Sequence, residues 1–386
     1  MGFVSQPLPL LLLVAGWLAG WLLDYLLAAL RVPAPVSFVT SQHFIADYRM
    51  AYTKQATQMK CAALLLLFSV ASVIDGARVL RPEPSKEVGG LLARRYLRLV
   101  ETETILDYHN GPVLSGTDGK LSAYVIWYGD FNETDKATVR DFFASFQVEN
   151  GTVTDVSRWW NMTYGFKDAT GASVPNDVML MGETNNTYSK GKNLNNTHIE
   201  EIMLDSLSVF PADPNAVYFV LTAADVEVED FCMNSCSSHF ASSPAAANGL
   251  QLPYAWVGNA KDQCPGMCAW PFAQPSYMPA QANLPLPPNG DVGVDGMLIQ
   301  VAYMLAGTAT NPFNNAFYQG DAAAPLEAGT ACVGSFGVGS YSGYPGELKK
   351  DVITGSEYNA EGVNDRKFLL PALWDPNTRK CTPLGV

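Results

Sequence analysis

Five residues between positions 232 and 268 have types and spacing that could bind a metal ion. Cys232 and Cys236 are followed by His239, and Cys264 and Cys268 repeat the spacing of the first two cysteines. Thiolates and imidazoles in such pairs are common zinc ligands. In an oxidising compartment the same thiols form disulfides instead. We favour disulfides and expect no metal and no cofactor, because features described below indicate secretion.

The disulfide hypothesis also includes Cys332 and Cys381, while the seventh cysteine, Cys61, lies near the N-terminus. Six cysteines allow fifteen pairings. Cysteines with matching spacing can pair across two segments, so we expect the 232/236 segment to be joined to the 264/268 segment. Cys332 is then expected to pair with Cys381.

Three carboxylates and one histidine are candidates for acid–base catalysis. Hydrolysis of a glycosidic bond uses two carboxyl groups roughly 5–10 Å apart, and Asp291, Asp295 or Glu327 could supply them. Helix capping by Asp295 and loop hydrogen bonding by Asp291 are the alternatives that we favour. His109, with Asp107 nearby, is a weaker candidate, for which a hydrogen-bonded turn is the favoured interpretation.

A predicted apolar helix at residues 295–307 precedes Thr-Asn-Pro at 310–312 and then Glu327. This layout resembles that of some zincin-like metallopeptidases, which need two histidines one turn apart and a glutamate to activate water. Tyr303 and Met304 stand where the first histidine and the glutamate would lie. A working zinc site is therefore not expected, and a zincin-like scaffold that lacks its metal site is one hypothesis for the fold.

Strands alternate with helices along the rest of the chain. Residues 121–128, 216–222 and 253–258 are rich in aromatic and β-branched residues and read as buried strands, and 177–181 is a shorter candidate. Helices are expected after Thr134 and Thr197, because apolar residues recur there at helical spacing. We predict an α/β (mixed α+β) fold, a single domain with a central mixed sheet, flanking helices and long Gly-, Pro- and Asn-rich loops.

Trp159, Trp160 and Trp270 are candidates for stacking on sugars, with core packing as the usual alternative.

The amino-acid composition excludes some classes of protein and of binding partner. Apolar residues make up 48% of the 386 residues, which excludes general disorder. The net charge is −13, so neither nucleic acid nor an anionic membrane surface is an expected partner, since both attract Lys- and Arg-rich proteins.

Two apolar runs precede the predicted domain. Residues 10–30 are long enough for a membrane span, whereas residues 62–74 have the basic start and small-residue end of a secretory signal peptide. A signal peptide does not begin so far into a protein, so we favour Met59 over Met1 as the start; a signal-anchor at 10–30 is the alternative. The expected segments are 1–58 as an upstream extension, 59–77 as the signal peptide, 78–106 as a leader and 107–386 as the folded domain, with no membrane span in the mature protein.

Five N-x-S/T sequons support secretion, because used sequons mark a solvated face in an oxidising compartment. They are Asn132, Asn150, Asn161, Asn185 and Asn195.

Long sequence blocks beyond residue 107 carry a family signature. Among them are YHNGPVLSG at 108–116, PYAWVGNAKDQCPGMCAWPF at 253–272, PNGDVGVDGM at 288–297, LAGTATNPFNNAFYQG at 305–320 and YPGELKKDVITGSEYNAEGVNDRKFLLPALWDP at 344–376. These blocks resemble the EXORDIUM / phosphate-induced protein family of plants. The resemblance implies a secreted apoplastic or cell-wall protein linked to growth responses, including those to brassinosteroid, and it implies no known reaction.

Two functional hypotheses follow. In the first, the chain is a secreted, glycosylated and disulfide-linked protein without catalysis that binds a cell-wall glycan or an extracellular protein. In the second, it is an extracellular hydrolase of wall carbohydrate or peptide that uses Asp291, Asp295 or Glu327. Carboxylates that line one cleft would favour the second hypothesis, whereas carboxylates that cap helices or bind amides would favour the first.

Overall fold

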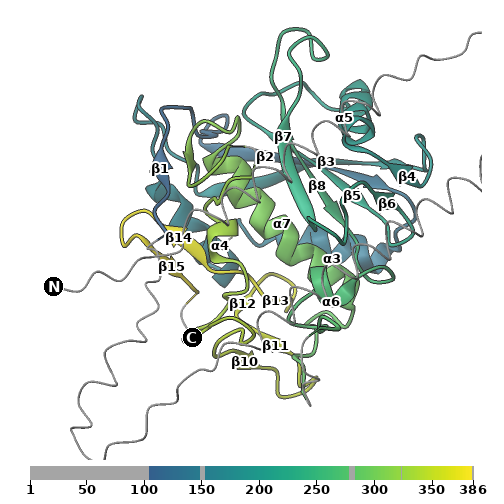
Figure 1. Ribbon diagram of the computed structural model, residues 1–386, viewed down its shortest axis with the longest axis vertical. Helices are drawn as coiled ribbons and strands as arrows, with labels where there is room; N and C mark the ends of the chain where they lie inside the picture. The colour runs from purple at the N-terminus through teal and green to yellow at the C-terminus, as the bar shows by residue number, and fades with distance from the viewer. Residues whose placement is uncertain (1–103, 148–152, 278–282, 323, 385–386) are drawn as a thin grey trace, which may run out of the picture. The chain divides into compact units, whose positions relative to one another are not determined.

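The computed structural model describes residues 104–147, 153–277, 283–322 and 324–384 (Figure 1). The chain divides into two compact units, Met1–Leu97 and Arg98–Val386, and every described residue belongs to the second. The expected upstream extension, the signal peptide and most of the 78–106 leader lie outside the described residues.

A five-stranded mixed sheet forms the centre of the second unit. Its strand order is β3 (Asp177–Asn186), β2 (Lys120–Tyr128), β5 (Val217–Thr222), β8 (Pro253–Gly258) and β7 (Ser237–Ala241). The first four strands are parallel to one another, and β7 pairs antiparallel with β8 at one edge. The four strands expected from the sequence are all present, and the predicted mixed α+β class is confirmed.

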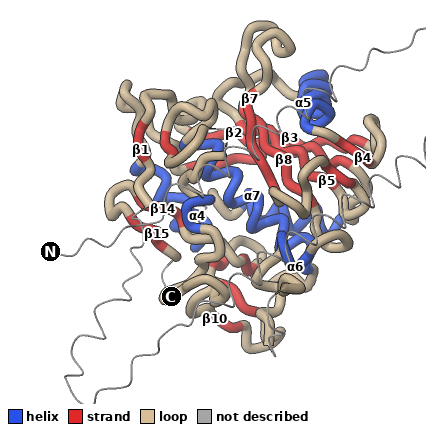
Figure 2. Tube along the Cα trace, viewed as in Figure 1, coloured by secondary structure: helices blue, strands red, loops and turns tan. Residues whose placement is uncertain are grey.

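Helices cover both faces of this sheet (Figures 1 and 2). α3 (Glu133–Ala144) and α7 (Val292–Thr310) contact each other and the sheet, whereas α5 (Asn196–Asp205) contacts β5 and β8. The connections β2–α3–β3 and β3–α5–β5 step across the sheet in opposite directions. Because parallel crossovers are right-handed, α3 and α5 must lie on opposite faces.

The other elements are short. The remaining helices are α4 (Asp155–Trp160), α6 (Pro265–Cys268), η1 (Asn161–Gly165), η2 (Ser206–Ser208) and η3 (Thr330–Cys332). Two-stranded ribbons pair β1 (Asp107–Tyr108) with β9 (Phe317–Tyr318), β4 (Asn193–Leu194) with β6 (Glu227–Val228), β10 (Lys349–Lys350) with β11 (Glu357–Tyr358), β12 (Ala360–Glu361) with β13 (Lys367–Phe368) and β14 (Leu373–Asp375) with β15 (Lys380–Thr382).

The predicted apolar faces are confirmed, but the caps are not those expected. In α3, Asn132 rather than Thr134 is the N-cap, and its Oδ1 accepts from the Asp135 amide at 2.8 Å. In α5, Asn195 rather than Thr197 is the N-cap. Asparagine is at least as good an N-cap as threonine, so each helix starts from the asparagine two positions before the expected threonine.

α7 is the core helix of the sheet's α3 face. It is long and apolar enough to cross a membrane by composition alone, yet 89% of its most apolar window is buried inside the protein. A helix that is apolar on all sides is expected to be surrounded by protein. The helix begins before the predicted 295–307 because Asp291, and not Asp295, is its N-cap, and it continues to Thr310, with Asn311 as the C-cap.

Two of the three tryptophans considered for sugar stacking belong to the core. Trp159 and Trp160 are fully buried, and their indole N–H groups donate to the carbonyls of Pro371 at 2.7 Å and Pro175 at 2.8 Å. Stacking of these two rings on a ligand is therefore excluded. Trp270 remains half-buried at the surface.

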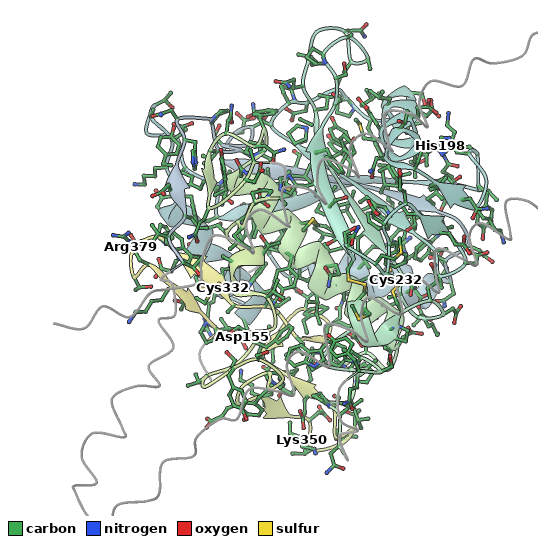
Figure 3. The ribbon with its side chains drawn as sticks, viewed as in Figure 1. Asp155, His198, Cys232, Cys332, Lys350 and Arg379 are labelled. Atoms are coloured by element: carbon green, nitrogen blue, oxygen red, sulfur yellow. A yellow bond between two sulfur atoms is a disulfide. The ribbon has the colours of Figure 1, made fainter. Side chains whose placement is uncertain are left out.

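The expected disulfides are present. Cys232 is bonded to Cys264 and Cys236 to Cys268, which joins the segment before β7 to α6, and the third bridge joins Cys332 to Cys381 (Figure 3).

Candidate functional site

Asp291 and Asp295 lie at the start of α7 and are occupied by local contacts. Oδ1 of Asp291 accepts from the amides of Gly293 at 2.8 Å and Val294 at 3.2 Å, and its carboxylate pairs with Lys261. Burial alone would raise the pKa of Asp291, but Lys261 and the two amides outweigh it and lower that pKa. A carboxyl group held ionised by a cap and a lysine is a structural one.

Asp295 is buried one turn further along. Its carboxylate accepts from the backbone amide of Asn289 at 2.8 Å and from Asn289 Nδ2 at 2.6 Å. Burial raises the pKa of Asp295 to about 7, and the charge of Asp291 adds to the effect, although the Asn289 donors oppose it.

This pKa predicts a pH-dependent stability. The folded protein holds the Asp295 proton more tightly than the unfolded chain, so the contribution is present at low pH and is lost as pH rises toward 7. We expect the free energy of unfolding to fall by roughly 2–3 kcal/mol between pH 5 and pH 8 through this group. Denaturant unfolding of wild type and Asp295→Asn at both pH values would check it. Equal pH slopes for the two proteins would contradict the assignment.

Glu327 belongs to a buried polar cluster at the other end of α7. His239 Nε2 lies 2.9 Å from Glu327 Oε1 and 2.7 Å from Oε2, and Asn311 Nδ2 donates to Oε1 at 2.7 Å. Only 2% of Glu327 is exposed. The cluster packs against Gly307, where a Cβ atom would come within 2.7 Å of Glu327 Oε2. A side chain at position 307 would therefore force the Glu327 carboxylate to move from its place beside His239.

The three candidate carboxylates do not share a cleft. Glu327 lies against Gly307, and Asp295 begins the same helix, so the rise of an α-helix separates these positions by about 18 Å. That distance is well beyond the roughly 5–10 Å that glycoside hydrolysis requires. Asp291 and Asp295 are only one helical turn apart, but Asp295 is 3% exposed and both carboxylates accept from backbone amides, so this pair does not line a cleft either. The arrangement therefore does not offer a substrate the acid–base pair of the hydrolase hypothesis.

His109 also has structural contacts. It follows β1, its ring stacks on Tyr318 with centroids 3.8 Å apart, and its Nδ1 lies 3.2 Å from the carbonyl of Ala316. These contacts join the β1–β9 ribbon to the loop after α7 and match the hydrogen-bonded turn favoured above.

No group of three or more His, Cys, Asp or Glu side chains that could hold a metal ion occurs among the described residues. Tyr303 and Met304, which occupy the zincin positions, are buried core residues. Sequence reasoning missed the His239–Glu327 pair, because 88 residues separate its members and His239 was weighed only with the neighbouring cysteines.

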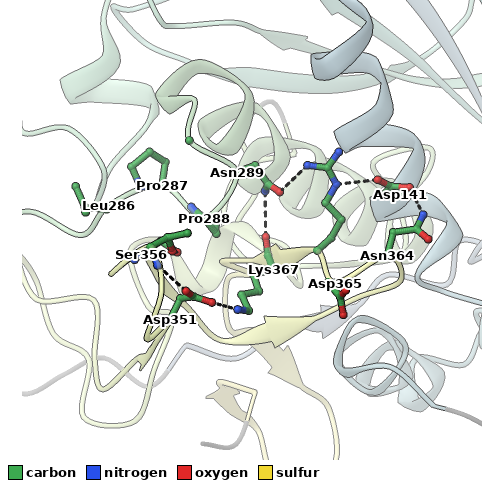
Figure 4. A pocket seen from close by; sticks show the side chains of 13 residues that line it. Asp141, Leu286, Pro287, Pro288, Asn289, Asp351, Ser356, Asn364, Asp365 and Lys367 are labelled. Carbon is green, nitrogen blue, oxygen red and sulfur yellow. Dashed lines mark hydrogen bonds and ion pairs between the residues drawn. The ribbon is translucent and has the colours of Figure 1, made fainter.

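A polar pocket of about 670 Å³ lies between α3, the loop before α7 and β13 (Figure 4). Arg366 donates to Asp141 at 2.7 Å and to Asn289 at 3.2 Å, and Lys367 pairs with Asp351. Because these charges already satisfy one another, a ligand would have to break existing contacts to bind them. The contacts that line this pocket hold the C-terminal ribbons against the core.

The second pocket is a cleft of about 560 Å³ and is lined by aromatic and small residues. It is called the aromatic cleft below. Tyr277 and Tyr341 are 75% and 68% exposed at its surface, Trp270 is half-buried, and Tyr303 and Phe336 are buried. Exposed apolar groups gathered around a cleft mark a binding site more often than a structural feature.

Three chain segments, far apart in sequence, form the aromatic cleft. The Cys236–Cys268 disulfide fixes α6, and Gln300 of α7 donates to the Cys268 carbonyl at 3.3 Å. On the other side, the Gly334 amide donates to the Tyr303 hydroxyl at 3.2 Å. The sequence singled out Trp270 as a stacking candidate but missed Tyr277 and Tyr341, because they line the same cleft only in the folded chain.

Four of the five sequon asparagines are described, and all four are exposed. Asn132, Asn185 and Asn195 use Oδ1 as an acceptor, from the Asp135 amide, Lys136 Nζ and the His198 amide, respectively. An N-glycan is attached through Nδ2, so these contacts are compatible with glycosylation. Asn161 is also exposed, and Asn150 lies outside the described residues.

Comparison with known proteins decides the family. A family model described as the Phosphate-induced protein 1 conserved region matches residues 106–384. The chain belongs to this family. The protein PHOSPHATE-INDUCED 1 of Nicotiana tabacum is 44% identical over 285 residues, which are 72% of this chain and 88% of that protein. EXORDIUM-like 1 of Arabidopsis thaliana is 43% identical over 291 residues, which are 73% of this chain and 90% of that protein.

EXORDIUM of Arabidopsis thaliana is 42% identical over 289 residues, or 72% of this chain and 89% of that protein. The EXORDIUM / phosphate-induced resemblance seen in the sequence is thus confirmed, and it identifies a growth-related plant protein. No solved structure matches the chain. The aromatic cleft lies within the part of the chain that the family model covers.

Proposed function

We propose that this member of the EXORDIUM / phosphate-induced family is a secreted, non-catalytic protein that binds a cell-wall glycan in the aromatic cleft. Its role in growth regulation, including brassinosteroid responses, would follow from that binding. The observation that carries the proposal is the cleft itself, with two exposed tyrosines and a half-buried tryptophan around one cavity.

Aromatic rings are suited to sugars because the C–H faces of a pyranose are apolar and pack flat on a ring. Partly exposed Tyr and Trp combine an apolar surface with a polar end that can hydrogen bond to hydroxyl groups. Ser342 adds a neutral hydroxyl group to the cleft, whereas Ser335 and Ser340 bond to each other and Gln300 bonds to Ser237 and to the Cys268 carbonyl. An extracellular protein partner is the second candidate, and it would use the same exposed rings.

Secretion is supported by disulfides and by sequon geometry. Three bridges link six cysteines, and such bonds persist in oxidising compartments. Protein recovered from culture medium is expected to begin near residue 78 and to shift in mass after enzymatic removal of N-glycans. Recovery of membrane-bound protein that retains residues 1–58 would contradict the choice of Met59 as the start.

A glycan array tests the binding proposal. Wild-type protein is expected to bind wall glycans, and Tyr277→Ala/Tyr341→Ala is expected to lose at least about tenfold in affinity, because both exposed rings are removed. Tyr164→Ala is the matched control, since Tyr164 is 47% exposed and is not part of the cleft. A protein that binds no glycan, or a double variant that binds like wild type, would refute the proposal.

A further inference from the structure

We infer that the aromatic cleft selects a neutral, β-linked glycan and rejects acidic ones. This inference rests on the proposed function, because it names the chemical class of glycan for the same cleft. Plant walls contain both neutral and uronate-rich polysaccharides, so the distinction decides which wall component the protein contacts.

The lining of the cleft carries no formal charge. None of the described residues around it is Asp, Glu, Lys, Arg or His. Placing a uronate carboxylate in such a cleft would remove it from water without a cation to receive it, which is unfavourable. Neutral hydroxyl groups of a sugar can exchange water for an uncharged polar group of the lining, such as the Ser342 hydroxyl, at little cost.

The polar pocket, unlike the aromatic cleft, is lined by charged residues. That pocket contains Asp141, Asp351, Arg366 and Lys367, so the protein does have cations in a cavity, but each is paired with a carboxylate. The net charge of −13 also repels a polyanion at long range. Both the local and the overall electrostatics therefore disfavour acidic polysaccharides.

The aromatic rings indicate the linkage. Tyr277 and Tyr341 are exposed and come from two separate segments, and Trp270 lies half-buried between buried neighbours such as Phe336, with ring centroids 5.7 Å apart. Rings that separate segments contribute to one cleft can stack on successive sugar units of one chain when those units present flat apolar faces. A β-1,4-linked glucan presents such faces along an extended chain, because its ring substituents are equatorial, whereas an α-1,4-linked glucan coils.

Isothermal titration calorimetry on the purified mature protein tests the inference with three tetrasaccharides. These are a β-1,4-linked glucan, an α-1,4-linked glucan and an α-1,4-linked galacturonan. We expect binding of the β-glucan alone, with an affinity that does not change between 50 and 500 mM salt, because no charge pairing is involved. Tyr341→Ala should weaken it by about tenfold, whereas Tyr341→Phe should retain it.

The possible results distinguish failure of this inference from failure of the proposed glycan-binding function. Preferred binding of the galacturonan or of the α-glucan, with loss in Tyr341→Ala, would overturn the neutral β-linked assignment while leaving a glycan-binding cleft. Binding that Tyr341→Ala does not affect would place the site elsewhere and overturn both. Absence of binding to these three probes, with binding to other glycans on the array, would overturn only the inference.

Discussion

Replacing Glu327 by alanine is expected to lower the free energy of unfolding by about 3–5 kcal/mol. The carboxylate is the partner of two buried groups, His239 Nε2 and Asn311 Nδ2. Removing one member of a buried polar cluster leaves the others without a partner, and this loss usually exceeds the net contribution of the pair. Denaturant unfolding followed by circular dichroism would measure the change.

Two further variants serve as a control and as a conservative comparison for Glu327→Ala. Glu229→Ala removes an exposed carboxylate and should change stability by no more than about 0.5 kcal/mol. Glu327→Gln keeps an oxygen acceptor for Asn311 and should lose less than alanine does. If Glu327→Ala lost under about 1 kcal/mol, the His239–Glu327 contact would not be the buried pair described above.

Removing the Cys332–Cys381 disulfide, by replacing both cysteines with alanine, is expected to cost about 4 kcal/mol. Its members are 49 residues apart, and the chain-entropy account assigns about that value to a loop of such length. The bridge joins η3 to β15 and so holds the C-terminal ribbon near the loop that borders the aromatic cleft.

The other two disulfides provide the comparison. Cys232–Cys264 and Cys236–Cys268 join the same two segments, and each spans 32 residues. If one is removed, the other still closes nearly the same loop, so either single loss should cost less than the loss of Cys332–Cys381. A larger cost for removing Cys232–Cys264 alone would contradict this account; thermal or denaturant unfolding would show it.

The elements themselves could be predicted because local pattern determines them. Runs of aromatic and β-branched residues at 121–128, 216–222 and 253–258 are now β2, β5 and β8, since such side chains suit strands that are buried on both faces. Val139, Phe142, Phe143 and Phe146 lie on the buried side of α3 and the turn after it, as their spacing predicted.

Contacts between distant residues could not be predicted in the same way. Helix starts were misplaced where two capping residues compete within a few positions, as with Asn132 and Thr134. Trp159 and Trp160 gave no sign that their indole N–H groups would find buried carbonyls. Helical spacing shows only that a tryptophan has an apolar neighbour, and tertiary packing decides whether it is covered.

The aromatic cleft likewise depends on contacts between residues that are far apart in the sequence. Tyr277, Tyr303 and Tyr341 lie on separate segments, and the Cys236–Cys268 disulfide and the Gly334–Tyr303 hydrogen bond are among the contacts that hold the cleft together. Of the three tryptophans that the sequence offered as stacking candidates, only Trp270 lines the cleft, and the sequence favoured a non-catalytic binder. It could not locate the cleft, because no local pattern marks residues that converge from three directions.

One measurement tests the central claim, that the protein binds a wall glycan without cleaving it. Purified mature protein would be incubated with a neutral β-linked oligosaccharide, and bound sugar and newly formed reducing ends would be quantified in the same sample. We predict saturable binding that Tyr277→Ala/Tyr341→Ala reduces at least about tenfold, with no increase in reducing ends over time. Release of reducing ends at a rate proportional to protein concentration would contradict the account and revive the hydrolase hypothesis.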